Sequence, residues 1–176
     1  MSAAVEQQFL EFSVSKLEEL TGRIVTCLGM LNEEQIWARG SANQNAIGNL
    51  VLHLCGNVRQ WIVAGVGEAA DVRRRDSEFA AQGGMAPQEL AGKLQGTVAE
   101  AVQVLRPLPH EQFTRRLAIQ GYDVSKFEAI YHVVEHFAMH TGQILFAAKM
   151  LTGADLGFYR HLQGALPPAA PPAHTP

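Results

Sequence analysis

The chain has 176 residues, of which 47% are hydrophobic and 18% charged, and its formal net charge at pH 7 is -3. These values are typical of a globular protein with one domain and argue against a disordered chain. Nucleic-acid-binding domains usually carry a strongly basic surface, so the weakly acidic balance disfavours DNA or RNA as a partner. The longest apolar segment, residues 45–67, is interrupted by His53, Asn57 and Arg59, so we also expect no membrane span.

The two cysteines, Cys27 and Cys55, each lie within an apolar helical pattern, and no CxxC motif is present. The N-terminal residues include acidic side chains and lack the basic start of a secretory signal peptide. Separate buried thiols are typical of a reducing compartment. We therefore expect a cytoplasmic protein without disulfide bonds.

Two amphipathic helices are predicted in the N-terminal part of the chain. The first covers about residues 4–31, where leucine and isoleucine recur at steps of three and four residues, as one buried helix face requires. The second covers about residues 46–64. Its expected N-cap is Asn45, because an asparagine side chain can accept hydrogen bonds from the free amides of a first helical turn, and Gly65 and Gly67 are expected to end it.

A long loop is expected over residues 66–86, between the second and third predicted helices, and loops of this length often carry function. Its basic run Arg73-Arg74-Arg75, which is followed by acidic residues, is either a solvated turn or the rim of a pocket for an anionic substrate or thiol. The third helix begins at Pro87, where a missing amide proton costs little, and two further prolines end it.

The fourth predicted helix has the clearest start, because Ser125 and Glu128 fit a capping box, and Gly153 is expected to end it. Before it, residues 112–123 alternate weakly between apolar and polar side chains, which predicts either a short hairpin or an irregular crossing. After it, residues 164–176 hold five of the eight prolines and are expected to form an extended tail.

These elements predict an all-α fold, a four-helix bundle with a long loop between helices 2 and 3. Residues 1–163 are expected to form its single domain, and residues 164–176 its Pro-rich tail. A wide apolar face on the first helix would allow two copies of the chain to pair.

Three histidines recur every four residues in the fourth predicted helix: His132, His136 and His140. At about 100° per residue they lie within about 40° of His136, and the helix is apolar nearly all round, so we expect them to point inward. A single buried histidine is more often a hydrogen-bonded core residue than a ligand. Two histidines at i and i+4 can, however, bind one metal ion. A third ligand from another helix would complete the site, and the second predicted helix offers His53.

The segments NAIGNLVLHLCGNVRQWI, residues 45–62, and HVVEHFAMHTGQI, residues 132–144, resemble the DinB/YfiT-like superfamily of small bacterial four-helix proteins. The resemblance extends from the first predicted helix to about Gly153. It implies one divalent metal ion held by His53, His136 and His140, and members of the superfamily often form homodimers. His132 has no ligand position in this pattern, so we expect it to line the pocket or to support a ligand.

Two amides lie close to the expected ligands. Asn57 follows His53 by one helical turn, and Gln143 lies near the line of His136. Each could orient a group bound to the metal, or could simply make an ordinary hydrogen bond. Cys55 is expected to point away from His53, and it is not counted as a ligand. The sequence assigns no catalytic residue.

Three neutral imidazoles leave a divalent ion with its full charge and an open position, which can hold water or a softer thiolate. The resemblance implies transfer of small thiols to electrophiles, or hydrolysis in some relatives. We therefore expect a metal-dependent S-transferase or hydrolase that acts on a small molecule. The expected metal is zinc or nickel, with manganese as a further possibility. The alternative is a non-catalytic metal-binding or stress-response protein.

Overall fold

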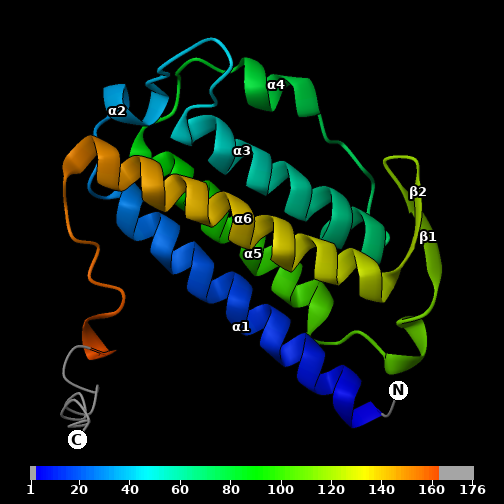
Figure 1. Cartoon of the computed structure of the whole chain (residues 1–176). Coiled ribbons are helices and arrows are strands. Elements are labelled where there is room, and N and C mark those ends of the chain that lie inside the picture. Colours follow the sequence, from blue (N-terminus) through cyan, green and yellow to red (C-terminus); the bar gives the residue numbers. More distant parts are fainter. Residues whose placement is uncertain (1–2, 163–176) are drawn as a thin grey trace, which may run out of the picture.

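The computed structural model describes residues 3–162, and most of these residues are helical (Figure 1). The expected Pro-rich tail, residues 164–176, lies outside the described residues. In chain order the elements are α1 (Ala3–Leu28), α2 (Glu33–Trp37), α3 (Ile47–Val58), η1 (Arg59–Val66), α4 (Arg75–Ala80), α5 (Pro87–Leu105), η2 (His110–Gln112), β1 (Arg116–Ile119), β2 (Tyr122–Ser125), α6 (Lys126–Thr152) and η3 (Arg160–Leu162).

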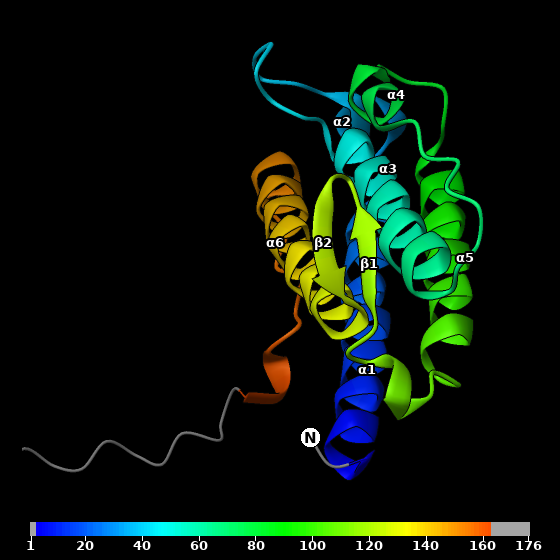
Figure 2. The same ribbon diagram turned by 90° about the vertical axis from the view of Figure 1, so that its right-hand side faces the viewer.

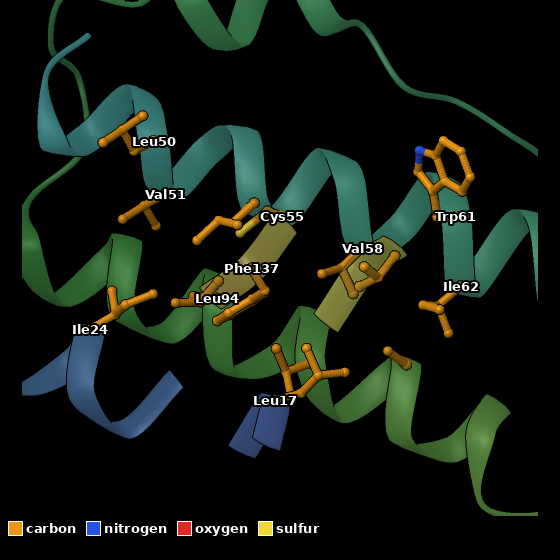
Figure 3. Close-up of a cluster of buried hydrophobic side chains, with 14 of the residues drawn as sticks. Leu17, Ile24, Leu50, Val51, Cys55, Val58, Trp61, Ile62, Leu94 and Phe137 are labelled. Atoms are coloured by element: carbon orange, nitrogen blue, oxygen red, sulfur yellow. The ribbon is translucent and has the colours of Figure 1, made fainter. Parts of the chain in front are cut away.

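Four long helices surround one apolar core. α1 contacts α5 and α6, and α3 contacts the same two helices from the other side (Figure 1). Leu17, Leu94 and Phe137 come from α1, α5 and α6, and they lie beneath the core-facing side chains of α3 (Figure 3). All three are fully buried. Burying a side chain of this size stabilises the fold by about 1.5–3 kcal/mol, so this shared core holds the helices that carry the histidines. None of the helices in residues 3–162 is long and apolar enough to span a membrane.

The ends of the first two long helices differ from the prediction. α1 ends at Leu28, earlier than expected, and the short helix α2 follows it. The expected N-cap Asn45 is wrong, because Ala46 occupies that position. The Asn49 side chain instead accepts a hydrogen bond from the Ala46 amide at 3.0 Å. An asparagine within the first turn therefore caps α3 from inside the helix.

α3 continues directly into the π-helix η1. The Gly67 amide donates to the Ile62 carbonyl, five residues back, at 2.8 Å. Each turn of a π-helix holds more residues than an α-turn, and such segments are frequent at functional sites. The helix continues through Gly65 to Val66, beyond the expected end near residue 64, and of the two expected glycines Gly67 ends it.

The connection between η1 and α5 is not a plain loop, because it contains α4, which was not predicted. α4 lies across α3 on the side away from α1 (Figures 1 and 2). Asn49 Nδ2 donates to the carbonyls of Glu78 and Ala81 at 2.9 and 2.8 Å, and Arg39 Nη2 also donates to the Ala81 carbonyl, at 2.9 Å. Hydrogen bonds from distant parts of the chain therefore position a helix that is too short to show hydrophobic periodicity.

The hairpin prediction for the segment before α6 is confirmed, and the irregular crossing is wrong. β1 and β2 pair antiparallel through a tight turn and lie against η1 and α6 (Figure 2). The capping box is also confirmed. The Ser125 amide donates to Glu128 Oε2 at 2.6 Å, and the Glu128 amide donates to Ser125 Oγ at 3.2 Å. α6 ends at Gly153, whose φ of 66° lies in the left-handed region that glycine tolerates.

Candidate metal centre

Three histidine side chains from two helices converge between α3 and α6. His53 comes from the middle of α3, and His136 and His140 come from successive turns of α6. His136 Nε2 lies 3.1 Å from His53 Nε2 and 3.1 Å from His140 Nε2. The three candidate ligand atoms all lie within 4.8 Å of one another. Tetrahedral zinc ligands at 2.0–2.1 Å from the metal are separated by about 3.3 Å, so the spacing of these nitrogens suits one metal ion.

The outer nitrogens of two of these rings have hydrogen-bond partners. His53 Nδ1 lies 3.0 Å from Glu78 Oε2, and His140 Nδ1 lies 2.7 Å from Gln143 Oε1. Both oxygens are acceptors, and an imidazole that donates from Nδ1 keeps the lone pair of Nε2 directed toward the other two rings. This is the usual arrangement of metal-binding histidines. His136 Nδ1 is buried and has no hydrogen-bond partner within residues 3–162.

The histidines of α6 are held in their neutral form. Burial lowers the pKa of His136 to about 3, and the neighbouring histidines add to the effect. Burial also lowers the pKa of His140 and of His132. Metal ligation requires a neutral imidazole, so protons compete little for these nitrogens at pH 7.

A buried ion pair supports His53 from behind. Arg73 Nε and Nη2 donate to the two carboxylate oxygens of Glu78, each at 2.8 Å. The two side chains are only 3% and 9% exposed. Burial raises the pKa of Glu78, but the hydrogen bonds from Arg73 and His53 outweigh burial, and the pKa is lowered. Glu78 is therefore ionised at neutral pH.

The backbone of α3 leaves room for this ion pair at one position. A β-carbon on Gly56 would overlap the Glu78 carboxylate and would approach Arg73 Nε to 2.9 Å. Glycine within a helix costs about 1 kcal/mol relative to alanine. The close approach of Glu78 to His53 therefore depends on a residue that weakens the helix locally.

Sequence reasoning missed Glu78. It lies in a six-residue helix without a recognisable pattern, and its partner Arg73 was expected only at a loop or pocket rim. The run of three arginines next to acidic residues was the one available signal. The structure separates these arginines, because Arg73 binds Glu78, while Arg75 lies over the Phe79 ring at 4.9 Å from its centroid.

His132 lies beside the three converging histidines. Its ring centroid is 4.2 Å from that of Trp61 and 5.5 Å from that of His136. Asn57 is 3% exposed, and its Oδ1 has no hydrogen-bond partner in the described part of the chain. Cys55 lies among the buried core side chains (Figure 3), and burial raises its pKa to about 11.

A cavity of about 480 Å³ opens next to His53 and His136. The remaining side chains around it are aromatic, amide, charged and aliphatic: Asn57, Trp61, Arg73, Arg75, Gln120, Tyr122, Val124, Glu128 and His132. A small molecule can therefore reach one face of the histidine cluster. The walls offer both apolar contact and hydrogen bonds, as small-molecule sites usually do.

The chain belongs to the family described as "Protein of unknown function (DUF1572)", whose model matches residues 4–162. No curated protein matches the chain. Solved structures share its fold. A conserved protein from Enterococcus faecalis has a TM-score of 0.71 and 14% identity, over 82% of this chain and 97% of that one.

The mycothiol-dependent maleylpyruvate isomerase has a TM-score of 0.61 and 17% identity, and a histidine-to-alanine mutant of that isomerase has a TM-score of 0.55 and 16% identity. Each comparison covers 77% of this chain but only 60% of the isomerase. At such identities the likeness establishes the fold and leaves the chemistry to the site itself.

Proposed function

We propose that this protein is a metal-dependent enzyme that transfers a small thiol to an electrophilic substrate. The observation that carries the proposal is the convergence of three Nε2 atoms from α3 and α6 beside a cavity large enough for a small molecule. We also assign the chain to the DinB/YfiT-like superfamily and its fold to the four-helix bundles. The matched segments and the packing of α1, α3, α5 and α6 support that assignment.

His53, His136 and His140 would hold the metal, which we take to be zinc or nickel. A divalent ion bound by three neutral imidazoles supplies uncancelled positive charge and an open position, where a thiol or water loses its proton more readily. The protein holds its own groups ready for that task. Glu78 and Gln143 keep the lone pairs of His53 and His140 directed inward, and burial keeps His136 neutral.

The cavity would hold the substrate. Trp61, Tyr122 and His132 provide aromatic surfaces for its apolar part, and the buried Asn57 Oδ1 can accept a hydrogen bond from it. Arg73 is committed to Glu78, so Arg75 is the arginine of this wall that remains for an anionic group. Within the run Arg73-Arg74-Arg75, we therefore assign the expected contact with an anionic substrate or thiol to Arg75.

A thiol is the preferred nucleophile for two reasons. A thiolate is a soft ligand that binds zinc and similar ions strongly. In addition, one protein with the same fold is a mycothiol-dependent isomerase. The protein's own Cys55 cannot play this part, because it is buried in the core and its pKa is raised to about 11.

The test is a conjugation assay with purified protein loaded with zinc, nickel or manganese, a panel of low-molecular-weight thiols and one reactive electrophile. We expect metal-dependent conjugation with at least one thiol, lost in His136→Ala and retained in Glu100→Ala, which alters an exposed ion pair that does not line the cavity. Hydrolysis of an ester or amide without thiol dependence would favour the hydrolase. The uncatalysed rate with every metal, thiol and hydrolytic substrate would favour a non-catalytic metal-binding protein.

A further inference from the structure

Two groups of opposite character meet at the outer nitrogen of His53. Glu78 Oε2 lies 3.0 Å from His53 Nδ1, and Arg73 Nη2 lies 3.1 Å from the same atom. A carboxylate can only accept a hydrogen bond, and a guanidinium can only donate one. A neutral imidazole carries one proton on one of its two nitrogens, so these two neighbours favour opposite tautomers of His53.

We propose that Glu78 selects the tautomer of His53 that exposes the Nε2 lone pair, and that Arg73 alone would select the other tautomer. This inference rests on the proposed function, because the lone pair matters only if Nε2 binds a metal. In the structure, the two carboxylate oxygens of Glu78 satisfy Arg73, and Glu78 also accepts from His53 Nδ1–H. The proton therefore stays on Nδ1, away from His136.

Removing the charge of Glu78 reverses this preference. In Glu78→Met the side chain keeps about the same length, but it has no oxygen that can accept. Arg73 Nη2, which lies 3.1 Å from His53 Nδ1, is then the polar group next to this nitrogen, and it can only donate. Nδ1 then accepts, the ring proton moves to Nε2, and this proton points at His136 Nε2, which is 3.1 Å away. A protonated Nε2 has no lone pair for a metal.

The surroundings hold both groups in place. Arg73 Nη1 donates to Gln60 Oε1 at 2.8 Å, and the Asn49 amide donates to the Glu78 carbonyl at 2.9 Å. Gly56 supplies the space for the carboxylate. Neither Arg73 nor Glu78 can move away from His53 Nδ1 without breaking buried hydrogen bonds. The tautomer of His53 therefore depends on whether Nδ1 donates to Glu78 or accepts from Arg73.

The experiment compares wild type, Glu78→Met and the double variant Arg73→Met/Glu78→Gln, with Glu100→Gln as a control at an exposed ion pair. Ring-nitrogen ¹⁵N NMR of the metal-free proteins at pH 7 reports which nitrogen of His53 carries the proton. Competition with a chromogenic chelator reports Zn²⁺ affinity. Circular dichroism and amide spectra confirm that each variant is folded.

We expect Nδ1–H in wild type and the control, and Nε2–H in Glu78→Met, with Zn²⁺ binding weaker by about 10- to 100-fold. In the double variant no arginine competes for the amide oxygen. This oxygen can accept from His53 again, so Nδ1–H should return and most of the affinity should recover. A purely structural role predicts instead that the double variant binds Zn²⁺ no better than Glu78→Met.

Three results would overturn the inference. They are Nε2–H in the wild-type protein, Nδ1–H in Glu78→Met, and a double variant that binds Zn²⁺ no better than Glu78→Met. Failure of the proposed function looks different. The tautomers would follow the expected pattern in the metal-free proteins, but wild type would bind no metal.

Discussion

The two sides of the histidine cluster are held in different ways. On α3, His53 is 5% exposed and is backed by a buried ion pair from the connection between η1 and α5. On α6, His136 and His140 are half-buried, and within residues 3–162 the only hydrogen bond of their outer nitrogens joins His140 to Gln143, three residues along the same helix. The position of His53 therefore depends on tertiary contacts, whereas the positions of His136 and His140 depend on the geometry of α6.

The difference shows where the precision of the site comes from. A spacing of four residues on one helix places His136 and His140 together without further support. His53 must be brought from another helix, in the right tautomer, and the support for this comes from Arg73 and Glu78. Substitutions of the α6 histidines should therefore remove candidate ligands, whereas substitutions behind His53 should affect the stability of the protein and the orientation and tautomer of the His53 ring.

The largest effect is expected from the candidate ligands on α6. His136→Ala removes the nitrogen that lies nearest to both other candidate ligands, so Zn²⁺ affinity should fall by at least about 100-fold. His132→Ala should retain one ion per chain, because the His132 ring lies against Trp61. Titration calorimetry would measure both. Loss of binding in His132→Ala together with normal binding in His140→Ala would place the ligand set one turn away.

The next largest effect concerns the free energy of unfolding and comes from the buried Arg73–Glu78 pair behind His53. Glu78→Ala leaves Arg73 buried without its counter-ion, which should lower the free energy of unfolding by about 3–5 kcal/mol. Glu100→Ala breaks the exposed pair with Arg59 and should cost less than about 1 kcal/mol. Urea denaturation of the metal-free proteins would measure the two values. Equal losses would mean that burial of the Arg73–Glu78 pair has no energetic consequence.

The pH dependence of the stability of the metal-free protein should report the protonation of His136 on α6. The pKa of His136 is about 3 in the folded protein and ordinary, near 6.5, when unfolded. Between these values the unfolded chain binds more protons, so the metal-free protein should lose stability as the pH falls below about 6.5. His136→Gln should flatten this slope. Denaturation at pH 7.5, 6.0 and 5.0 would measure it, and identical slopes would show that His136 is not held neutral by folding.

A smaller effect should follow from filling the space beside Glu78. Gly56→Ala would displace the carboxylate from His53 and weaken Zn²⁺ binding by several-fold to about 10-fold. Gly92→Ala in α5 is the matched control, because a β-carbon there meets nothing within 4 Å. It should leave binding unchanged and stabilise the helix by up to about 1 kcal/mol. Equal Zn²⁺ affinities in the two variants would show that the position of Glu78 does not matter.

Much of the fold could be predicted from local patterns. The periodic leucines of α1, Pro87 at the start of α5, and Ser125, Glu128 and Gly153 at the ends of α6 are local signals, and the structure places them as expected. The inward row of histidines on α6 is local as well. The convergence of His53 with His136 and His140 was expected partly from a resemblance, because spacing alone cannot place two helices side by side.

What could not be predicted depends on contacts between distant residues. α4 is too short for periodicity, and Asn49 and Arg39 hold it from other segments. Asn49 also replaces Asn45 as the cap of α3 by reaching back from inside the helix. Glu78 acquires its role only when α4 packs over Gly56. No pattern within a short window of sequence contains this information.

The most direct test of the metal centre is anomalous diffraction from crystals grown with Zn²⁺. We predict one peak per chain, about 2.0–2.1 Å from the Nε2 atoms of His53, His136 and His140, with Glu78 still bonded to His53 Nδ1. A peak held by other residues would contradict this account. So would an empty cluster at saturating Zn²⁺, or a His53 ring turned away from α6.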